Sequence, residues 1–384
     1  MNICIITSSF PSHRDDLVQA PFVGNFIEGL KARGHHVFIF TQDRQGKKEE
    51  FLKDVKVIWF TWMTSPKPMV ELNPLNPLDL IHILSLFYHG KRALLPFLRE
   101  NRIDACLGLW VLPGGYFANY AYRKIGIPYS IWALGSDIQR YGGNFLLYRV
   151  MRRIVQEATG VFADGFDLAK GVEERFKKKC FFLATTRTLS SPLFLKKEEP
   201  GKSGEGPYRF LFVGRLEKVK GIDLLLESAA LLKEEGIRFH LTVVGNGSLG
   251  AMARDFVDRK GLGDWVTLTG NISDERLVSM YTASDCVVIP SRSESIPLVF
   301  SEALNFNKEM IVADVGDLGM LGRTYGVAWV VPPEDVRALK EMMKKIVETG
   351  DRRRREVAGE GRREELKRLF NIETSVERFL ADYL

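Results

Sequence analysis

Two series of alternating strand-like and helix-like runs constrain the fold of this chain more than any other feature. Short apolar runs alternate with longer amphipathic ones, and the rhythm restarts after residue 207. Such βαβ alternation predicts parallel sheets with helices on both faces. We therefore expect an α/β protein with two doubly wound, Rossmann-like domains that face a central cleft. The expected strands are Ile3–Ile6, Val37–Phe40, Ala105–Leu109, Tyr129–Ala133, Tyr208–Val213, Phe239–Val244, Trp265–Thr269, Val287–Ile289 and Met310–Ala313.

The segment from Lys196 to Pro207 separates the two series and predicts a domain boundary. It is rich in charged residues, Gly and Pro, and it has no apolar side chain other than proline, which is typical of a linker. At 384 residues the chain is long enough for two domains that each bury a core. We expect an N-terminal domain over residues 1–195, a linker over 196–207 and a C-terminal domain over 208–365.

Composition favours a soluble protein in a reducing, cytoplasmic compartment. Hydrophobic residues make up 45% and charged residues 27% of the chain, as in ordinary globular proteins. No run approaches the roughly 18 apolar residues of a membrane span, and the N-terminal residues read as a first strand rather than a signal peptide. The cysteines are scattered without a C-x-x-C pair, which predicts buried free thiols and no structural metal. They are Cys4, Cys106, Cys180 and Cys286.

Charge is distributed unevenly between the two halves. Residues 1–200 contain 27 Lys+Arg against 19 Asp+Glu, whereas residues 201–384 contain 27 against 29. A basic first half suits an anionic partner, such as acidic lipid, a phosphorylated acceptor or nucleic acid, although a solvated basic surface is the simpler interpretation. Asp79–Glu100 is rich in Leu, Ile and Phe and carries Lys91 and Arg92. This stretch predicts either a helix on a membrane surface or a helix packed on its own sheet.

One glycine-rich loop resembles a dinucleotide-binding fingerprint without completing it. Gly245–Gly250 follows a strand and opens a helix, but the next strand ends in Gly270 and Asn271 rather than in the acid that binds a ribose. Gly201-Lys202-Ser203 likewise lacks the preceding glycine of a P-loop. We therefore expect neither a nicotinamide nor a flavin cofactor, although the first loop could still approach a nucleotide.

Two acids flank a predicted helix start in the second half. Glu294 stands in a loop after the apolar run Cys286–Pro290, and Glu302 lies more than one turn inside the following helix. Pro297 suits the first helical position, because its missing N–H would be unpaired there. The free amides of the first turn lie between the acids and attract an anion. This order fits a ligand with hydroxyls, a phosphate group and more hydroxyls, as in a nucleotide-sugar.

Two cations follow the first strand of the second domain. Arg215 can grip phosphate oxygens bidentately, and Lys220 can add a mobile positive charge. Fixed cations lower the barrier to glycosidic bond cleavage, because the leaving diphosphate gathers negative charge. The alternative is that both are surface cations on a turn between a strand and a helix.

Together these segments resemble retaining glycosyltransferases with the two-domain GT-B fold, in particular glycosyltransferase family 4, the group 1 glycosyltransferases. The acids match the family's E-x7-E motif, and the cations match its G-R-L…K-G segment. The resemblance covers nearly all of residues 208–345. The segments that carry it are Gly214-Arg215-Leu216, Lys220-Gly221, residues 281–291, Glu294 to Glu302 and residues 326–333.

The resemblance implies roles for individual residues. Arg215 and Lys220 would bind the donor diphosphate, and Glu294 would hold the hexose hydroxyls; these form the expected catalytic set. Glu302 would hold the ribose hydroxyls. The other donor contacts would come from Gly24, Gly214, Asn271, Ile296, Pro297, Leu298 and Val299. Trp110 and Asp137 would lie on the acceptor side, and no metal would be bound.

The first domain departs from the family pattern at two positions. Many relatives carry a His directly before Trp110 and another directly before the Gly-Ser-Asp that ends at Asp137, whereas this chain has Leu109 and Leu134. The second of those histidines usually faces the donor sugar, so its absence bears on catalytic competence. The resemblance also implies that residues 366–384 form a C-terminal helix that packs back on the first domain.

The resulting prediction is a retaining hexosyltransferase that uses a nucleotide-sugar, with UDP favoured and GDP next. The acceptor would be a saccharide or a lipid-linked molecule at the inner face of a membrane, with peripheral contact to anionic lipid. The nucleotide-sugar is a substrate, so no cofactor is expected, and no nucleic acid partner is expected. The alternatives are a non-catalytic sugar-nucleotide-binding scaffold and a related GT-B sugar-nucleotide epimerase.

Overall fold

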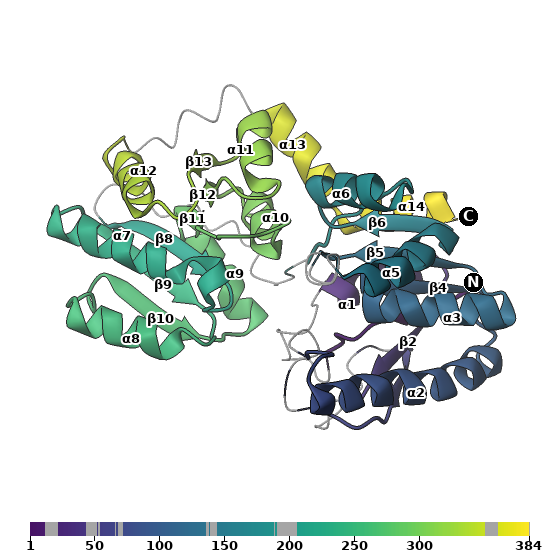
Figure 1. The fold of residues 1–384 in the computed structure, drawn as a ribbon. Helices are drawn as coiled ribbons and strands as arrows, with labels where there is room; N and C mark the ends of the chain where they lie inside the picture. The colour runs from purple at the N-terminus through teal and green to yellow at the C-terminus, as the bar shows by residue number, and fades with distance from the viewer. Residues whose placement is uncertain are drawn as a thin grey trace. The chain divides into compact units, whose positions relative to one another are not determined.

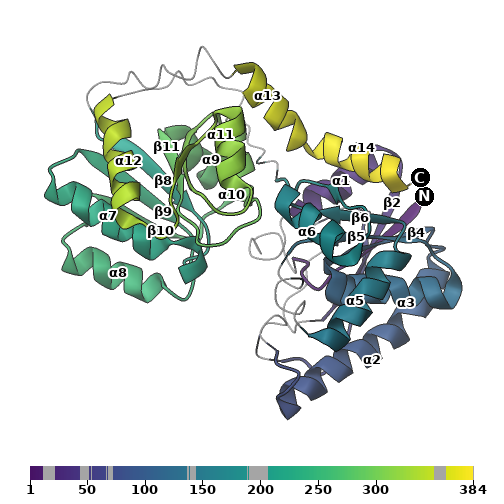
Figure 2. The ribbon, with the colours of Figure 1, turned by 45° about the horizontal axis from the view of Figure 1, so that its top comes forward.

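The computed structural model describes two compact units. It describes residues 1–11, 22–43, 52, 54–65, 67, 72–135, 138, 144–187, 189, 206–349 and 360–383. One unit comprises Met1–Ala184 with Ile372–Leu384, and the other comprises Thr185–Asn371. Figures 1 and 2 show their elements in two views.

The first unit is built on a parallel sheet, which has seven strands within the described residues. The strand order is β3-β2-β1-β4-β5-β6-β7, so the order reverses between β1 and β4. Ligands of open parallel sheets bind beyond the carboxyl ends of the strands at such a switch point. The strands are β1 (Asn2–Ile6), β2 (His36–Gln42), β3 (Lys56–Phe60), β4 (Ala105–Leu109), β5 (Tyr129–Ala133), β6 (Gly160–Ala163) and β7 (Phe181–Phe182).

Helices cover both faces of this sheet. The helices α2, α3 and α5 pack side by side in one layer, and α1 and α14 pack together in the other (Figures 1 and 2). The bounds are α1 (Phe22–Ala32), α2 (Pro77–Glu100), α3 (Tyr116–Ile125), α5 (Phe145–Glu157), α6 (Phe166–Phe176) and α14 (Ile372–Tyr383).

The C-terminal helix α14 is an integral part of the first unit. The rings of Phe26 and Phe379 lie 5.5 Å apart, and Arg33 forms an ion pair of 2.8 Å with Glu377. Gly29 makes room for the helix, because a Cβ there would lie 2.8 Å from a methyl group of Val376. The chain therefore returns to its first unit at its C-terminal end, and the return begins at Ile372 rather than at residue 366.

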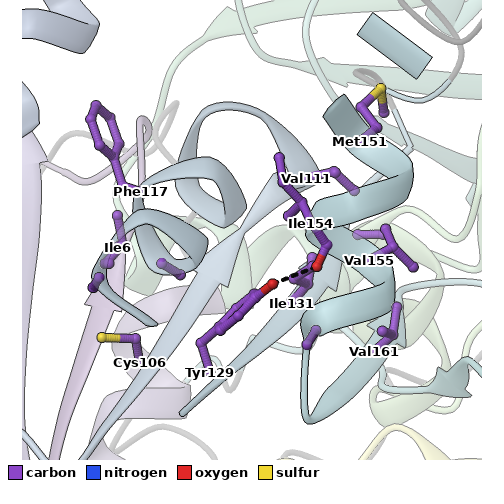
Figure 3. Close-up of a cluster of buried hydrophobic side chains, with 14 of the residues drawn as sticks. Ile6, Cys106, Val111, Phe117, Tyr129, Ile131, Met151, Ile154, Val155 and Val161 are labelled. Atoms are coloured by element: carbon purple, nitrogen blue, oxygen red, sulfur yellow. Dashed lines mark hydrogen bonds between the residues drawn. The ribbon is translucent and has the colours of Figure 1, made fainter. Parts of the chain in front are cut away.

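A buried cluster between the sheet and the α3–α5 layer forms the core of the first unit. Figure 3 shows Phe117, Ile131 and Ile154 among its members. The hydroxyl of Tyr129 donates to the backbone oxygen of Ile154 at 2.6 Å, and the Asn119 amide donates to that hydroxyl at 2.9 Å. Burial raises the pKa of Tyr129, so this hydroxyl stays protonated as a structural donor.

The second unit is also a doubly wound parallel sheet, with six strands among the described residues. Its order is β10-β9-β8-β11-β12-β13, with the reversal between β8 and β11. The strands are β8 (Tyr208–Val213), β9 (Phe239–Val244), β10 (Val266–Gly270), β11 (Cys286–Ile289), β12 (Glu309–Ala313) and β13 (Trp329–Val331). The helices are α7 (Ile222–Glu234), α8 (Gly250–Arg259), α9 (Asp274–Ala283), α10 (Leu298–Asn305), α11 (Leu318–Tyr325), α12 (Val336–Thr349) and α13 (Glu360–Leu369).

These sheets confirm the predicted fold class of two doubly wound α/β domains; the central cleft stays a prediction. The expected boundary at residues 195 and 196 differs from the observed division after Ala184. Within the expected linker, residues 196–205 lie outside the described residues. All four cysteines are buried and free, as expected. No described helix combines the length and apolar character needed to cross a bilayer.

The segment after β4 differs from its expectation. The sequence pattern predicts a helix over Gly114–Lys124, but Trp110–Gly115 forms a separate turn and α3 begins at Tyr116. Trp110 has a φ of 62° there. The chain folds tightly back over the strand, because a Cβ on Gly114 would lie 2.2 Å from the Leu109 oxygen. Glycine permits this close backbone approach, which a helical pattern does not reveal.

Candidate functional site

The loops that follow β8, β9 and β10 meet through backbone contacts in the second unit. The Gly214 amide donates to Val244 at 3.0 Å, and the Gly245 amide donates to Gly270 at 2.9 Å. A Cβ on Gly245 would lie 2.0 Å from the Gly214 oxygen, and φ is 128° at Gly245. The glycine-rich loop that resembles a dinucleotide fingerprint therefore serves here as packing for the loop that carries Arg215.

Arg215 is exposed beside this junction. Within the described parts of the chain, its guanidinium forms no hydrogen bond or ion pair. Asn271 is also exposed, directly after β10. Both side chains follow the carboxyl ends of parallel strands. Arg215 follows β8 at the switch point, where a ligand is expected, whereas Asn271 follows the edge strand β10. Arg215 therefore offers an exposed positive charge at this edge, and its electrostatic neighbour is Glu217.

A second junction joins the loop before α7 to the loop after β11. Gly221 has a φ of 73°, and a Cβ there would lie 2.0 Å from the Pro290 oxygen. The Arg292 amide donates to the Val219 oxygen at 2.8 Å. The Arg292 guanidinium also binds Asp223 through two hydrogen bonds of 2.7 and 2.8 Å. These contacts fix the segment that carries Lys220 against the segment that carries Glu294.

Gly221→Ala is expected to lower the free energy of unfolding by at least about 2 kcal/mol more than Gly236→Ala. Both glycines have nearly the same φ, 73° and 72°, but a Cβ on Gly236 meets nothing within 4 Å. The shared left-handed conformation costs an L-residue about 1–2 kcal/mol in either variant. Urea denaturation of both variants measures the difference, and equal losses would contradict the close contact with Pro290.

The structure brings Lys220 and Glu294 together as an ion pair. Their side chains are 22% and 12% exposed, so the pair is largely shielded from water. The Ser291 hydroxyl donates to the same Glu294 oxygen at 3.1 Å. A cation expected at the diphosphate and an acid expected at the hexose are thus direct neighbours. They are separated by 74 positions in the chain.

The helix α10 begins one residue later than predicted. Pro297 has φ −73° and ψ 149°, so it caps the helix and Leu298 is the first helical residue. The prediction for Pro297 is wrong because the fixed φ of proline suits a cap with extended ψ equally well. The amides of Ile296, Leu298 and Val299 have no hydrogen-bond acceptor among the described residues. These N–H groups and the helix dipole give the start of α10 a positive potential.

Glu302 is buried within α10, so it is not an ordinary exposed helical acid. Its side chain is 3% exposed, and it accepts a hydrogen bond of 2.7 Å from the Tyr281 hydroxyl. Arg187 lies 3.8 Å from its other oxygen and also pairs with Asp274. Burial raises the pKa of the Glu302 carboxyl, while the charge of Arg187 opposes that shift. Tyr281 is itself held by stacking on Phe306 at 4.8 Å.

Sequence reasoning missed the residues that support the two acids. Tyr281 lies in the segment that resembles the family's lead-in to the acidic motif, and that resemblance was its only signal. Arg187 and Asp274 are 87 positions apart, and no local pattern connects either of them to Glu302. Arg292 lies two residues before Glu294, but nothing in the sequence predicted its pairing with Asp223.

The remaining expected site residues belong to the first unit or lie outside the described residues. Gly24 lies in α1, and a Cβ there would meet nothing within 4 Å, so packing alone does not require glycine. Trp110 lies in the turn after β4. Asp137 lies outside the described residues. No group of three or more His, Cys, Asp or Glu residues that could hold a metal occurs in the described part of the chain.

Comparisons with solved structures define the class of fold. Sucrose-phosphate synthase from Thermosynechococcus elongatus aligns with a TM-score of 0.75 at 20% identity, covering 100% of this chain and 98% of that one. Anabaena HepE in complex with UDP-glucose aligns with a TM-score of 0.71 at 14% identity, covering 99% of both chains. At these identities the likeness shows the fold alone. The fold is that of the GT-B glycosyltransferases.

Sequence comparisons indicate which glycosyltransferases this chain resembles. Residues 195–364 match the family Glycosyl transferases group 1. Alpha-D-kanosaminyltransferase from Streptomyces kanamyceticus is 28% identical over 38% of each chain. D-inositol 3-phosphate glycosyltransferase from Rhodococcus erythropolis is 38% identical over 29% of this chain and 27% of that protein. These matches span less than half the length of either relative. They support the predicted resemblance to group 1 glycosyltransferases; the family 4 assignment and the retaining mechanism stay predictions.

Proposed function

We propose that this protein is a retaining glycosyltransferase that moves a hexose from a nucleotide-sugar to a saccharide or lipid-linked acceptor. The main support is the Lys220–Glu294 ion pair. It lies in the same unit as Arg215 and α10, and residues 195–364 match group 1 glycosyltransferases. A cation, an acid and the free amides at the start of α10 offer complementary groups for a sugar diphosphate. A UDP-sugar is favoured, with a GDP-sugar next, and HepE has been solved with UDP-glucose.

In the proposed reaction, the bond between the anomeric carbon and the diphosphate oxygen breaks, and a bond to the acceptor oxygen forms. The acceptor's proton passes to the departing phosphate on the same face of the sugar. Arg215, Lys220 and the first amides of α10 stabilise the negative charge that gathers on that phosphate. Because these groups supply positive charge, we propose that the reaction needs no metal.

The remaining donor contacts follow from the same proposal. Glu294 accepts hydrogen bonds from hexose hydroxyls, and Lys220 divides its charge between Glu294 and the phosphate. One oxygen of Glu302 is held by Tyr281, and the other accepts from a ribose hydroxyl. Asn271 and the Gly214 backbone contact the nucleotide. In the first unit, the resemblance implies a donor contact for Gly24 and an acceptor-side role for Trp110 and Asp137.

Calorimetric titration with UDP, GDP and ADP tests the donor site directly. We expect one nucleotide to bind, and Lys220→Ala to weaken that binding by about tenfold or more, because a cation that contacts the phosphates is lost. Lys345→Ala is the matched control and should not alter the affinity. Lys345 belongs to the same unit, where it lies over the ring of Trp329. If no nucleotide binds, the proposed function is wrong.

Leu134 favours a second candidate, in which the protein binds a sugar nucleotide without transferring the sugar. Many relatives carry a His at this position, and that His usually faces the donor sugar. Nucleotide binding without turnover across a broad panel of acceptors would support this scaffold. Conversion of the donor sugar with no acceptor present would instead support an epimerase.

A further inference from the structure

The outward face of α2 carries a continuous stripe of exposed apolar side chains. Leu78, Ile81, Leu84 and Tyr88 are 69%, 48%, 60% and 61% exposed, and Leu75 before the helix is 89% exposed. The opposite side of the helix packs on the core of the first unit through Leu86, Leu94 and Phe97. The helix is therefore apolar on both sides, and ordinary packing on its own sheet explains only one of them. We call Leu75, Leu78, Ile81, Leu84 and Tyr88 the outer stripe.

The part of α2 that follows the outer stripe is basic. Between Asp79 and Glu100 the helix contains no carboxylate, whereas it contains Lys91 and Arg92. Asp79 is 4% exposed, and its carboxylate accepts from the Asn73 amide at 3.0 Å and from Lys67 at 3.2 Å. The hydrogen bond from Asn73 and the charge of Lys67 hold the pKa of Asp79 below its ordinary value. Its negative charge is thus paired on the inner side of the helix.

A shallow pocket adjoins the stripe. It has a volume of about 350 Å³. Its lining comes from the edge strand β3 and the residue after it, and from the middle of α2: Ile58, Trp59, Phe60, Thr61, His89, Arg92 and Ala93. Both His89 and Arg92 are exposed. Arg92 therefore offers a guanidinium beside an apolar wall, an arrangement that suits a phosphate attached to an apolar chain.

A second group of exposed apolar side chains lies in the same helix layer, at the start of α5. Phe145 and Leu146 at the start of α5 are 69% and 71% exposed, and the Arg149 guanidinium lies 5.8 Å from the Phe145 ring. Both α2 and α5 pack against α3, which lies between them (Figures 1 and 2). Because helices of a parallel α/β sheet run opposite to the strands, both helices start at the carboxyl edge of the sheet.

We propose that the outer stripe and the adjoining pocket dock the first unit on an anionic phospholipid surface. The stripe enters the boundary between headgroups and acyl chains, and Arg92 binds a lipid phosphate. Charge complementarity favours this occupant over a second copy of the chain. Lys91 and Arg92 match the negative headgroups of such a surface, whereas α2 of a second copy offers no carboxylate between Asp79 and Glu100 to pair with them. The proposal goes beyond the proposed function and does not rest on it.

Vesicle co-sedimentation of the full chain without any sugar nucleotide tests the proposal. We expect binding to vesicles of 70% phosphatidylcholine and 30% phosphatidylglycerol, and little binding to phosphatidylcholine alone. Leu84→Glu should weaken the partition coefficient by about tenfold or more, because a charge would enter the lipid interface. Arg92→Glu should weaken it by about tenfold and reduce its dependence on salt. Met320→Glu, at a 39% exposed apolar residue of α11, is the matched control and should bind like wild type.

Each other outcome overturns the proposal. If the protein does not bind anionic vesicles, it has no affinity for the proposed surface. If it binds both kinds of vesicle equally, anionic headgroups do not attract it. Wild-type binding by Leu84→Glu shows that the outer stripe does not enter the lipid. The remaining alternative is that the stripe binds a second copy of the chain. Sedimentation velocity tests it, because Leu84→Glu would then dissociate a dimer. Nucleotide binding is unaffected by either result, so this test and that of the proposed function fail separately.

Discussion

Arg215→Ala is expected to lower kcat for sugar transfer by about 10²–10³-fold, the range seen when one preorganised group that stabilises developing charge is removed. Arg215 is exposed and forms no ion pair within the described residues. Its removal therefore takes away a positive charge without breaking a contact that the fold needs. The midpoint of thermal unfolding should stay within about 2 °C of wild type, as for most surface substitutions. Steady-state kinetics with the donor identified by titration, together with a thermal scan, measure both quantities.

Arg238→Ala is the control for that experiment. Arg238 is an exposed arginine of the same unit that precedes β9, so it lies at the opposite edge of the sheet from Arg215. The two variants remove the same charge from the unit, and any effect of net charge alone would appear in both. Full activity of Arg215→Ala would exclude this side chain from the phosphate site, and equal losses in both variants would point to a general electrostatic effect.

Glu302→Ala is expected to abolish nucleotide binding and to lower the free energy of unfolding by about 2–4 kcal/mol. The stability loss has two physical sources. The buried Tyr281 hydroxyl loses an acceptor at 2.7 Å, and a cavity opens where the carboxylate was. Arg187 keeps Asp274 as a partner, so the full cost of stranding a buried cation does not arise. Urea denaturation gives the stability, and calorimetric titration gives the affinity.

Tyr281→Phe separates the two effects of Glu302→Ala. It removes the hydrogen bond and keeps both the carboxylate and the packing of the ring on Phe306. We expect a loss of about 1–2 kcal/mol in stability and retained nucleotide binding. Nucleotide binding by Glu302→Ala at wild-type affinity would remove Glu302 from the donor site. An unchanged free energy of unfolding in Glu302→Ala would contradict its buried place between Tyr281 and Arg187.

Strands that are buried on both faces could be predicted closely from the sequence. Ala105–Leu109 and Tyr129–Ala133 were expected with the bounds that β4 and β5 have, because a central parallel strand appears as one short apolar run. The segment after β4 could not be predicted in this way. Its fold depends on the close approach of Gly114 to Leu109, and such a contact leaves no periodic pattern. The start of α10 was missed by one residue because proline suits two adjacent positions.

The sequence by itself determined the two parallel sheets, because periodicity is a local property. Its resemblance to a known family marked Glu294, Glu302, Arg215 and Lys220 as candidates. Only the tertiary structure decided which of these groups meet. It pairs Lys220 with Glu294, separated by 74 positions, and it buries Glu302 against Tyr281. The physical reason is that ion pairs and burial depend on how distant loops pack at the ends of the strands. The same packing leaves the Arg215 side chain exposed, without a hydrogen bond or ion pair among the described residues, so that a ligand can reach it.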